Sequence, residues 1–321
     1  MTALLQLDRV SVEIGGVQLL QDLSLSLERG QILGLVGESG SGKSLTALTA
    51  LGLLPLIGGR VSAGTISFDG VDIATLGEKG RRALRGRRIG FVTQNPMTAL
   101  DPVQKIGAQI DIVSRQHLGL DRRSARARTI DLMTQLRIPE AAAVAEAYPH
   151  QLSGGMKQRV VIAMALAGDP EMIVADEPTT ALDVTVQAQI VQILANLVQK
   201  RNLGLMLITH DMGVVAQICD RVAVLYAGRL AEERSVGSVF AAPAHPYTSA
   251  LINCIPQENM AAGSLTGIRG QVPSASDYPE GCRFHPRCAA ADARCRSERP
   301  LPHQLQTDGV VACHHPFGGL A

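Results

Sequence analysis

A glycine-rich octapeptide lies near the start of the chain, between two segments of different periodicity. It reads Gly37-Glu38-Ser39-Gly40-Ser41-Gly42-Lys43-Ser44 and matches the pattern G-x-x-x-x-G-K-[ST]. The apolar run before it, LSLSLERGQILGLVG, predicts a strand, and residues 44–54, SLTALTALGLL, have the apolar spacing of a helix. The octapeptide therefore sits in a strand, loop, helix order, which is the context that this pattern requires.

These residue types suit the binding of phosphate. Glycines allow successive backbone N–H groups to curl around phosphate oxygens, and the helix N-terminus adds the positive end of its dipole. Lys43 would reach the β- and γ-phosphates of a nucleotide, and the Ser44 hydroxyl would bind Mg²⁺. The alternative is a glycine turn with an exposed lysine. The full pattern in this context favours a nucleotide site to which all eight residues contribute.

Two carboxylates follow a second apolar run. The run Met172–Ala175 predicts a buried strand that delivers Asp176 and Glu177 at its C-terminal end, where open α/β sheets bind ligands. Asp176 would hold Mg²⁺ directly or through water, and Glu177 would polarise the attacking water. An acidic pair after a strand is otherwise a helix cap or a surface feature. Because the octapeptide is also present, we favour the catalytic interpretation.

The remaining segments predict an α/β fold with a helical subdomain. From about Asp101 to Ala167, amphipathic stretches such as IGAQIDIVSRQHLG and SARARTIDLMTQLRI predict helices. MIVAD and GLMLITHD predict buried strands on either side of the helical pattern TVQAQIVQILANLVQKRN, and this alternation indicates a mainly parallel sheet. We expect a nucleotide-binding domain over residues 1–240, a helical subdomain within it at about 95–168, and a small C-terminal domain over residues 241–321.

Composition and charge limit the class of protein. The 321 residues are 46% hydrophobic and 18% charged, which indicates a globular chain rather than a disordered or fibrous one. The 30 basic and 29 acidic residues leave a net charge of +1, so no broad attraction to nucleic acid is indicated. The N-terminus lacks the features of a secretory signal, and no run approaches the roughly 18 apolar residues that span a bilayer. We therefore expect a cytoplasmic chain that acts on a membrane only through partner subunits.

A second octapeptide narrows the class of nucleotide-binding protein. It reads Leu152-Ser153-Gly154-Gly155-Met156-Lys157-Gln158-Arg159, and its serine and two glycines at a helix start make a second anion-binding N-terminus. It lies shortly before the carboxylate pair and resembles the signature sequence of ABC ATPases. The resemblance covers about residues 5–235 and implies a P-loop NTPase of the ABC ATPase type, with a helical subdomain, that hydrolyses ATP with Mg²⁺.

The resemblance also implies roles for residues outside the first octapeptide. Gln94, in FVTQNP, is similar to the glutamine that contacts Mg²⁺ and couples the nucleotide to the membrane subunit. Ser153, Gly154 and Gly155 resemble the segment that closes over the γ-phosphate of ATP bound to the opposite subunit. The ATP site is thus expected to be divided between two chains that pair head to tail.

Three further positions match the family in sequence order. Asp183, in ALDV, resembles the aspartate of the subunit-interface loop, and His210, in ITHD and downstream of Glu177, resembles the switch histidine. The family stacks adenine on an aromatic residue, but the corresponding position here is Ile14, in VSVEIGG. An aliphatic side chain packs against the base without the preference that an aromatic face supplies.

The C-terminal part indicates the kind of transporter. Its segments AHPYTSAL, at residues 244–251, and GCRFHPRC, at residues 281–288, resemble the extension on ATPase subunits of the dipeptide, oligopeptide and nickel importer family. Cys282, Cys288, Cys295 and Cys313 crowd into this part and indicate a metal site. The gaps of five, six and seventeen residues between them are wider than the C-x₂-C pairs of zinc ribbons. The resemblance implies a [4Fe-4S] cluster, with Zn²⁺ or free thiols as the alternatives.

Together these features predict the ATPase of a peptide importer. The resemblance implies two membrane-spanning permease subunits and a second ATPase subunit, either a related chain or a copy of this one. It also implies an extracytoplasmic solute-binding protein, and it places the chain at the cytoplasmic face of the cell inner membrane. The same motor importing nickel or a metal chelate is an alternative. An ABC ATPase that acts on nucleic acid or ribosomes is disfavoured, since such proteins usually carry coiled-coil insertions or two ATPase cores.

Overall fold

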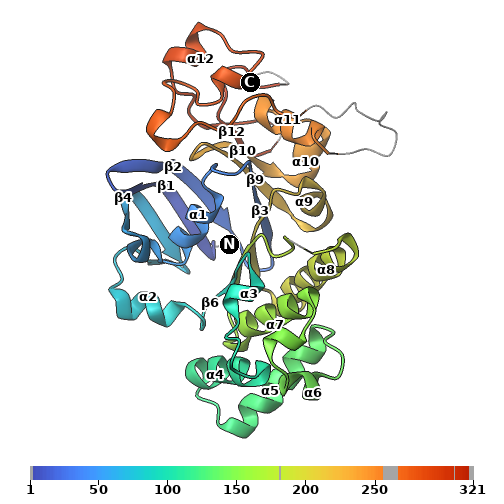
Figure 1. The fold of residues 1–321 in the computed structure, drawn as a ribbon. Helices are drawn as coiled ribbons and strands as arrows, with labels where there is room; N and C mark the ends of the chain where they lie inside the picture. The colour runs from blue at the N-terminus through green and yellow to red at the C-terminus, as the bar shows by residue number, and fades with distance from the viewer. Residues whose placement is uncertain (1–2, 181, 256–266, 307, 318–321) are drawn as a thin grey trace. The chain divides into compact units, whose positions relative to one another are not determined.

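The computed structural model describes residues 3–180, 182–255, 267–306 and 308–317, which divide into two compact units (Figure 1). The first unit comprises Met1–Leu27, Leu33–Ala74 and Thr209–Ala321. The second comprises Glu28–Ile32 and Thr75–Ile208. Residues 256–266, 307 and 318–321 of the expected C-terminal domain lie outside the described residues.

An antiparallel sheet opens the first unit. Its strands are β1 (Leu5–Ile14), β2 (Val17–Leu27), β4 (Gly59–Phe68) and β5 (Val71–Asp72), in the order β2-β1-β4-β5. Gly15 and Gly16 join β1 to β2 with φ values of 58° and 81°, as a two-residue hairpin turn requires. Ile14 therefore pairs with Val17 across the turn.

The other strands of the first unit include β3 (Ile32–Val36), the strand that leads into the phosphate-binding octapeptide. They are β3, β9 (Arg221–Tyr226), β10 (Arg229–Ser235), β11 (His303–Gln304) and β12 (Val310–Val311). Strand β3 pairs in parallel with β9, which pairs antiparallel with β10, and β12 lies between β10 and β11. All five residues of β3 are buried, as expected of a parallel strand covered on both faces.

Short helices complete the first unit. They are α1 (Lys43–Ala50), α9 (Met212–Ile218), α10 (Val236–Ala241), α11 (Pro246–Asn253) and α12 (Ala293–Ser297), with 3-10 turns η1 (Leu54–Ile57), η3 (Ala275–Asp277) and η4 (His285–Arg287). Tyr247 of α11 and Phe284 share one hydrophobic cluster with Val36, Val224 and Tyr226. The C-terminal segment therefore packs on the same core as strands β3 and β9.

The second unit contains a parallel sheet and most of the long helices. Its strands are β6 (Ile89–Val92), β7 (Met172–Asp176) and β8 (Gly204–Ile208), in the order β8-β7-β6. Its helices are α2 (Glu78–Leu84), α3 (Pro96–Ala99), α4 (Ile106–Leu118), α5 (Arg122–Gln135), α6 (Ala141–Ala145), α7 (Gly154–Ala167) and α8 (Val184–Arg201), with the 3-10 turn η2 (Pro149–Gln151).

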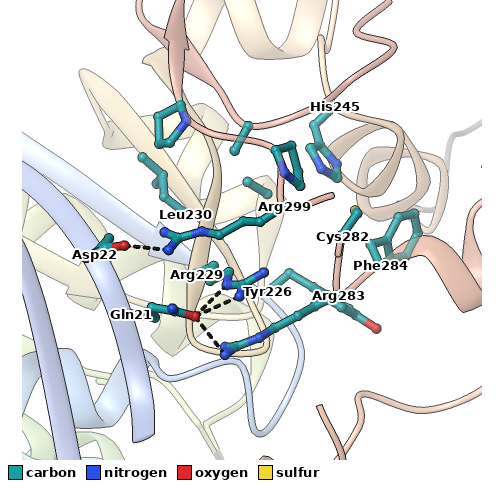
Figure 2. Close-up of a pocket in the computed structure, with 14 residues that line it drawn as sticks. Gln21, Asp22, Tyr226, Arg229, Leu230, His245, Cys282, Arg283, Phe284 and Arg299 are labelled. Atoms are coloured by element: carbon teal, nitrogen blue, oxygen red, sulfur yellow. Dashed lines mark hydrogen bonds and ion pairs between the residues drawn. The ribbon is translucent and has the colours of Figure 1, made fainter. Parts of the chain in front are cut away.

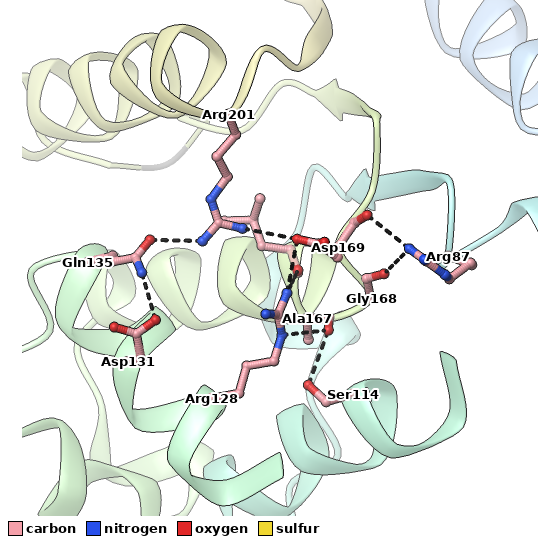
Figure 3. Close-up of polar contacts among 10 residues, drawn as sticks. Arg87, Ser114, Arg128, Asp131, Gln135, Ala167, Gly168, Asp169 and Arg201 are labelled. Carbon is pink, nitrogen blue, oxygen red and sulfur yellow. Dashed lines mark hydrogen bonds and ion pairs between the residues drawn. The ribbon is translucent and has the colours of Figure 1, made fainter. Parts of the chain in front are cut away.

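Helix α7, which begins within the signature-like octapeptide, is anchored at its C-terminal end (Figure 3). The Ser114 hydroxyl and Arg128 Nε donate to the Ala167 carbonyl at 3.1 and 3.2 Å. Arg87 Nη1 donates to the carbonyls of Gly168 and Asp169, each at 3.2 Å. These contacts satisfy carbonyls at the helix end and place positive charge at the negative end of the helix dipole. Helix α7, which carries the signature-like octapeptide at its N-terminal end, is thus held in place at its C-terminal end.

The α/β fold class predicted from the sequence is confirmed, with two local corrections. The run LSLSLERGQILGLVG forms two strands, because Gly30, at φ 72°, and the Gln31 N–H bond to the Glu28 carbonyl turn the chain between them. The helix expected at residues 44–54 ends at Ala50, and a separate 3-10 turn follows it. Among the described residues, we find no helix that is both long and apolar enough to cross a membrane.

Candidate functional site

Residues 37–44, here called the phosphate loop, connect β3 to α1 in the first unit. Gly37 has φ 148°, and a Cβ atom there would lie 2.3 Å from the Leu225 carbonyl oxygen, so a side chain does not fit. Lys43 is only 7% exposed, and its Nζ donates to the carbonyls of Gly37 at 2.7 Å and Glu38 at 2.9 Å. Two carbonyls at the start of the loop therefore bind the amino group of the lysine near its end.

Two hydroxyl groups of the phosphate loop are placed differently. Ser44, in the first turn of α1, is exposed. Ser41 is fully buried, and its Oγ has no hydrogen-bond partner among the described residues, while its carbonyl accepts from the Gly228 N–H at 2.9 Å. A buried hydroxyl without a partner costs free energy unless a ligand satisfies it. This feature fits a loop that is completed by phosphate oxygens.

The carboxylate pair lies at the end of β7 in the second unit. Asp176 is the last residue of the strand, and Glu177 follows it with φ 46°, a left-handed backbone that is uncommon for a residue with a side chain. Glu177 Oε2 accepts from Gln94 Nε2 at 3.0 Å and from the Thr180 hydroxyl at 2.9 Å. Strained backbone of this kind persists where surrounding contacts hold it, and such positions cluster at functional sites. The structure thus brings together Gln94 and Glu177.

The signature-like segment forms the start of α7. Ser153 is the N-cap residue, and its Oγ accepts from the Met156 N–H at 3.3 Å. Ser153 and Gly154 are exposed, so this helix end, with its first N–H groups, is accessible at the surface of the second unit. A Cβ atom on Gly155 would lie 2.6 Å from Val186 Cγ1 of α8, so this glycine allows the two helices to approach. The arrangement fits the anion-binding N-terminus predicted from the sequence.

The remaining predicted residues lie at the ends of elements. Asp183 is the N-cap of α8, and its Oδ1 accepts from the Val186 N–H at 2.9 Å. His210 is exposed and directly precedes Asp211, which caps α9. Ile14 is the half-buried last residue of β1 and pairs with Gly59 of β4. The roles of these three residues stay predictions.

All four C-terminal cysteines line one cavity, together with His285, His314 and His315. Burial raises the pKa of the Cys282 thiol, and the nearby Cys295 and Cys288 raise it further. Burial also raises the pKa of Cys313, to about 11, and the other three cysteines again contribute. Four thiols that influence one another from one cavity fit a site for a thiolate-bound metal centre. Binding of a metal there would displace the thiol protons.

Three arginines line a neighbouring cavity that also includes Cys282 (Figure 2). Arg229 donates through Nε and Nη2 to Gln21 Oε1 at 2.9 and 2.7 Å, and Arg283 Nη2 donates to the same oxygen at 3.0 Å. Burial lowers the pKa of both guanidinium groups to about 10. Arg299 pairs with Asp22, which also lines the cavity, so three arginines face one carboxylate and the cavity has more positive than negative charge. This excess fits an anionic centre on the cysteine side.

The sequence analysis missed how the C-terminal segment reaches the phosphate loop. Arg287 and Tyr247 both bind Glu38, the second residue of that loop. The sequence did contain one signal for this contact, the carboxylate of Glu38. A carboxylate in a loop that binds phosphates needs a cation to offset its charge. The arginines of GCRFHPRC were visible, but nothing in their spacing indicates which of them would serve.

Comparisons with known proteins agree with this geometry. Residues 20–180 match the family described as "ABC transporter", and residues 231–295 match "Oligopeptide/dipeptide transporter, C-terminal region". The chain is 43% identical over 319 residues to the dipeptide transport ATP-binding protein DppD of Escherichia coli K12, covering 98% of this chain and 97% of that protein. It is 44% identical over 302 residues to the probable D,D-dipeptide transport ATP-binding protein DdpD of the same strain, covering 94% and 92% of the two chains.

Solved structures with the same fold are ATP-binding cassettes. CbiO1 of Clostridium perfringens, part of the ABC transporter complex cbiONQ, matches with a TM-score of 0.67 and 26% identity, covering 75% of this chain and 92% of that one. The cassette MJ0796, in a dimeric post-hydrolysis state with ADP and Pi, matches with a TM-score of 0.63 and 26% identity, covering 72% of this chain and 98% of that one. The chain therefore belongs to the ATP-hydrolysing subunits of ABC transporters, in the branch that carries the oligopeptide/dipeptide transporter C-terminal region.

Proposed function

We propose that this chain hydrolyses ATP to drive the import of dipeptides or oligopeptides. The observation that carries the hydrolytic part is the contact of Gln94 with Glu177, at the end of a buried strand and on strained backbone. The peptide substrate is supported by relatives that are named as dipeptide transport and peptide import ATP-binding proteins and that match more than nine tenths of the chain.

We assign each step of hydrolysis to named residues of the chain. Lys43 and the backbone N–H groups of the phosphate loop bind the β- and γ-phosphates, which replace the loop carbonyls that now accept from Lys43. Ser44, Gln94 and Asp176 would hold Mg²⁺, and the bound ion would neutralise phosphate charge. Glu177 orients the attacking water and accepts its proton. Its hydrogen bond from Gln94 holds the accepting carboxylate in place.

Other residues serve the pairing of two ATPase subunits. Ser153, Gly154 and Gly155 bind the γ-phosphate held by the opposite subunit through the accessible N-terminus of α7. Asp183 lies at the subunit interface and His210 contacts the γ-phosphate, while Ile14 packs on the adenine. The solved relative MJ0796 is itself a dimer with ADP and Pi.

We place the chain in a membrane complex at the cytoplasmic face of the inner membrane. Two permease subunits carry the peptide across, a second ATPase subunit completes the pair, and an extracytoplasmic solute-binding protein delivers the peptide. The match to the oligopeptide/dipeptide C-terminal region supports this assembly.

The transport proposal is tested by uptake in cells that carry either the native chain or Glu177→Gln. Labelled dipeptides, longer peptides and nickel are supplied in parallel. Loss of dipeptide or longer-peptide uptake in the variant supports peptide import and reports its size range. Intact peptide uptake with lost nickel uptake would move the assignment to metal import, with the same ATPase mechanism.

We also propose that the four cysteines hold a [4Fe-4S] cluster. The four thiols line one cavity, and the arginines that line the neighbouring cavity with Cys282 supply positive charge to an anionic centre. The zinc alternative has its own support, because ligand atoms of Asp292, Cys295 and His315 lie within 4.8 Å of one another. Chain purified without oxygen should be brown, with about four iron and four sulfide per chain. A colourless preparation with one zinc per chain would overturn the cluster.

A further inference from the structure

The phosphate loop is tied to the C-terminal segment through one of its own residues, Glu38. Arg287 Nη1 donates to Glu38 Oε2 at 2.7 Å, and Arg287 Nη2 donates to Glu38 Oε1 at 2.9 Å. Such a fork of two parallel bonds is the strongest form of the arginine–carboxylate contact. The Glu38 N–H donates to the hydroxyl of Tyr247, a fully buried residue of α11, at 2.8 Å.

The arginine of this contact is itself held in place. Its side chain is 5% exposed, and its Nε donates to the Arg269 carbonyl at 2.8 Å. The same guanidinium donates to the Tyr226 hydroxyl and packs against the rings of Tyr226 and Phe284, with centroid distances of 5.7 and 5.9 Å. A cation fixed this firmly can position Glu38, whereas a mobile surface arginine could not.

The third polar group of Glu38, its backbone carbonyl, contacts the lysine of the phosphate loop. This carbonyl accepts from Lys43 Nζ at 2.9 Å. The N–H, the carboxylate and the carbonyl of one residue are thus bound by Tyr247, Arg287 and Lys43 respectively. Before ATP binds, Glu38 therefore links Lys43 to the C-terminal segment.

The charge of Glu38 gives this contact a second consequence. Its carboxylate is 28% exposed, in a loop that receives the negative phosphates of ATP. Unpaired, it would repel them and would be free to fold over the loop. Arg287 both offsets that charge and holds the carboxylate in a fixed position.

We propose that Arg287 is a positioning residue for ATP binding, which acts by holding Glu38 so that the phosphate loop is ordered and its acidic side chain neutralised. The C-terminal extension is then a working part of the nucleotide site, in addition to any role of its cysteines. This inference rests on the ATP site proposed above.

The test is a double-substitution cycle on the full chain, with the dissociation constant for ATP and Mg²⁺ measured by calorimetry. Arg287→Met keeps the side-chain volume and should weaken ATP binding about tenfold, the size of one charge-assisted hydrogen bond. The same change in a Glu38→Gln background should have little effect, because no charge remains to be held. Arg294→Met removes an exposed ion pair of the same extension, with Glu298 at 2.9 Å, and should bind ATP as the native chain does.

Two further measurements separate positioning from loss of folding. At saturating ATP the turnover number of Arg287→Met should stay near native while KM for ATP rises, and Arg287→Lys, which keeps the charge but not the fork, should show a smaller rise. Native affinity in a folded Arg287→Met chain overturns the proposal, as does equal weakening with and without the Glu38→Gln substitution. Lys43→Ala serves as the reference, because unchanged ATP binding there would instead contradict the proposed nucleotide site.

Discussion

Glu177 combines three properties that bear on catalysis. It follows directly on a buried strand, adopts φ 46°, and accepts hydrogen bonds from Gln94 and Thr180 on the same oxygen. A carboxylate that is held in place in this way can accept a proton from the attacking water. The positive φ is strain that the surrounding contacts maintain.

Glu177→Gln should lower ATP turnover about 10²-fold or more, because the amide cannot accept the proton of the attacking water. The shape of the side chain is kept, so ATP affinity should change little. Steady-state phosphate release by the assembled transporter measures turnover, and calorimetry measures affinity. Glu298→Gln, on the exposed face of the extension, is the matched control and should turn over normally. Native turnover in Glu177→Gln would assign the proton acceptor to another residue.

His245 makes the stability of the first unit depend on pH. It is 3% exposed, its Nδ1 accepts from the Tyr247 N–H at 3.0 Å, and burial lowers its pKa to about 4. An unfolded histidine takes up a proton near pH 6.5, so between about pH 6.5 and 4 the unfolded chain binds a proton that the folded chain does not. The free energy of unfolding should therefore fall as the pH falls through this range.

His245→Asn keeps an acceptor for the Tyr247 N–H but does not titrate. Between pH 7 and pH 5 the native chain should lose about 2 kcal/mol more of unfolding free energy than this variant does. Urea unfolding at the two pH values measures the difference. His150→Asn, at an exposed position of the second unit, should behave as the native chain. An equal loss in native and His245→Asn chains would show that another group is responsible.

At the scale of elements, helices α7 and α8 each begin at a residue that caps the helix and that also has a proposed functional role. Ser153 and Asp183 each accept a backbone N–H at the first turn of their helices, α7 and α8. For the same residues we have proposed contacts with the nucleotide or with the partner ATPase subunit. Their polar character is thus required by local capping as well as by the expected function.

Asp183 allows the two requirements to be separated. Asp183→Ala removes the cap of α8 and should lower the free energy of unfolding by about 1 kcal/mol, whereas Asp183→Asn keeps an acceptor and should be near native. If the charge also serves the subunit interface, Asp183→Asn will lower ATP turnover in the paired ATPases without changing stability. Urea unfolding and phosphate release are measured on both variants. Equal stability of the Asp183→Ala and native chains would contradict the capping contribution.

At the scale of the whole molecule, the exposed start of α7 predicts pairing with a second ATPase subunit. With ATP and Mg²⁺, Glu177→Gln should double in mass, either alone or when mixed with a related ATPase chain, since ATP holds the two chains together until it is hydrolysed. Light scattering after size exclusion measures the mass. The double variant Lys43→Ala, Glu177→Gln should stay at the mass of one chain. A single-chain mass for Glu177→Gln under both conditions would contradict the divided site.

Local signals in the sequence were sufficient to predict the elements that we propose bind nucleotide. Residues 37–44 and 172–177 combine apolar runs with glycine or carboxylate at fixed positions, so their strand-end placement follows from neighbours in the chain. The break between β2 and β3 was not predicted, because the turn at Gly30 lies within a continuous apolar pattern. The pairing of β12 with β10 was also missed, since two-residue strands have no periodicity to detect.

The sequence by itself determined the family, the phosphate loop and the carboxylate strand, because each of these depends on residues close together in the chain. It also placed the cysteines in one segment, though not around one cavity. Only the tertiary structure decided that Arg287 binds Glu38 across 249 positions of sequence and that the Tyr247 hydroxyl accepts from the N–H of the same residue. The sequence contains several arginines that could pair with Glu38. Packing against Tyr226 and Phe284 places Arg287, rather than another arginine, beside this carboxylate.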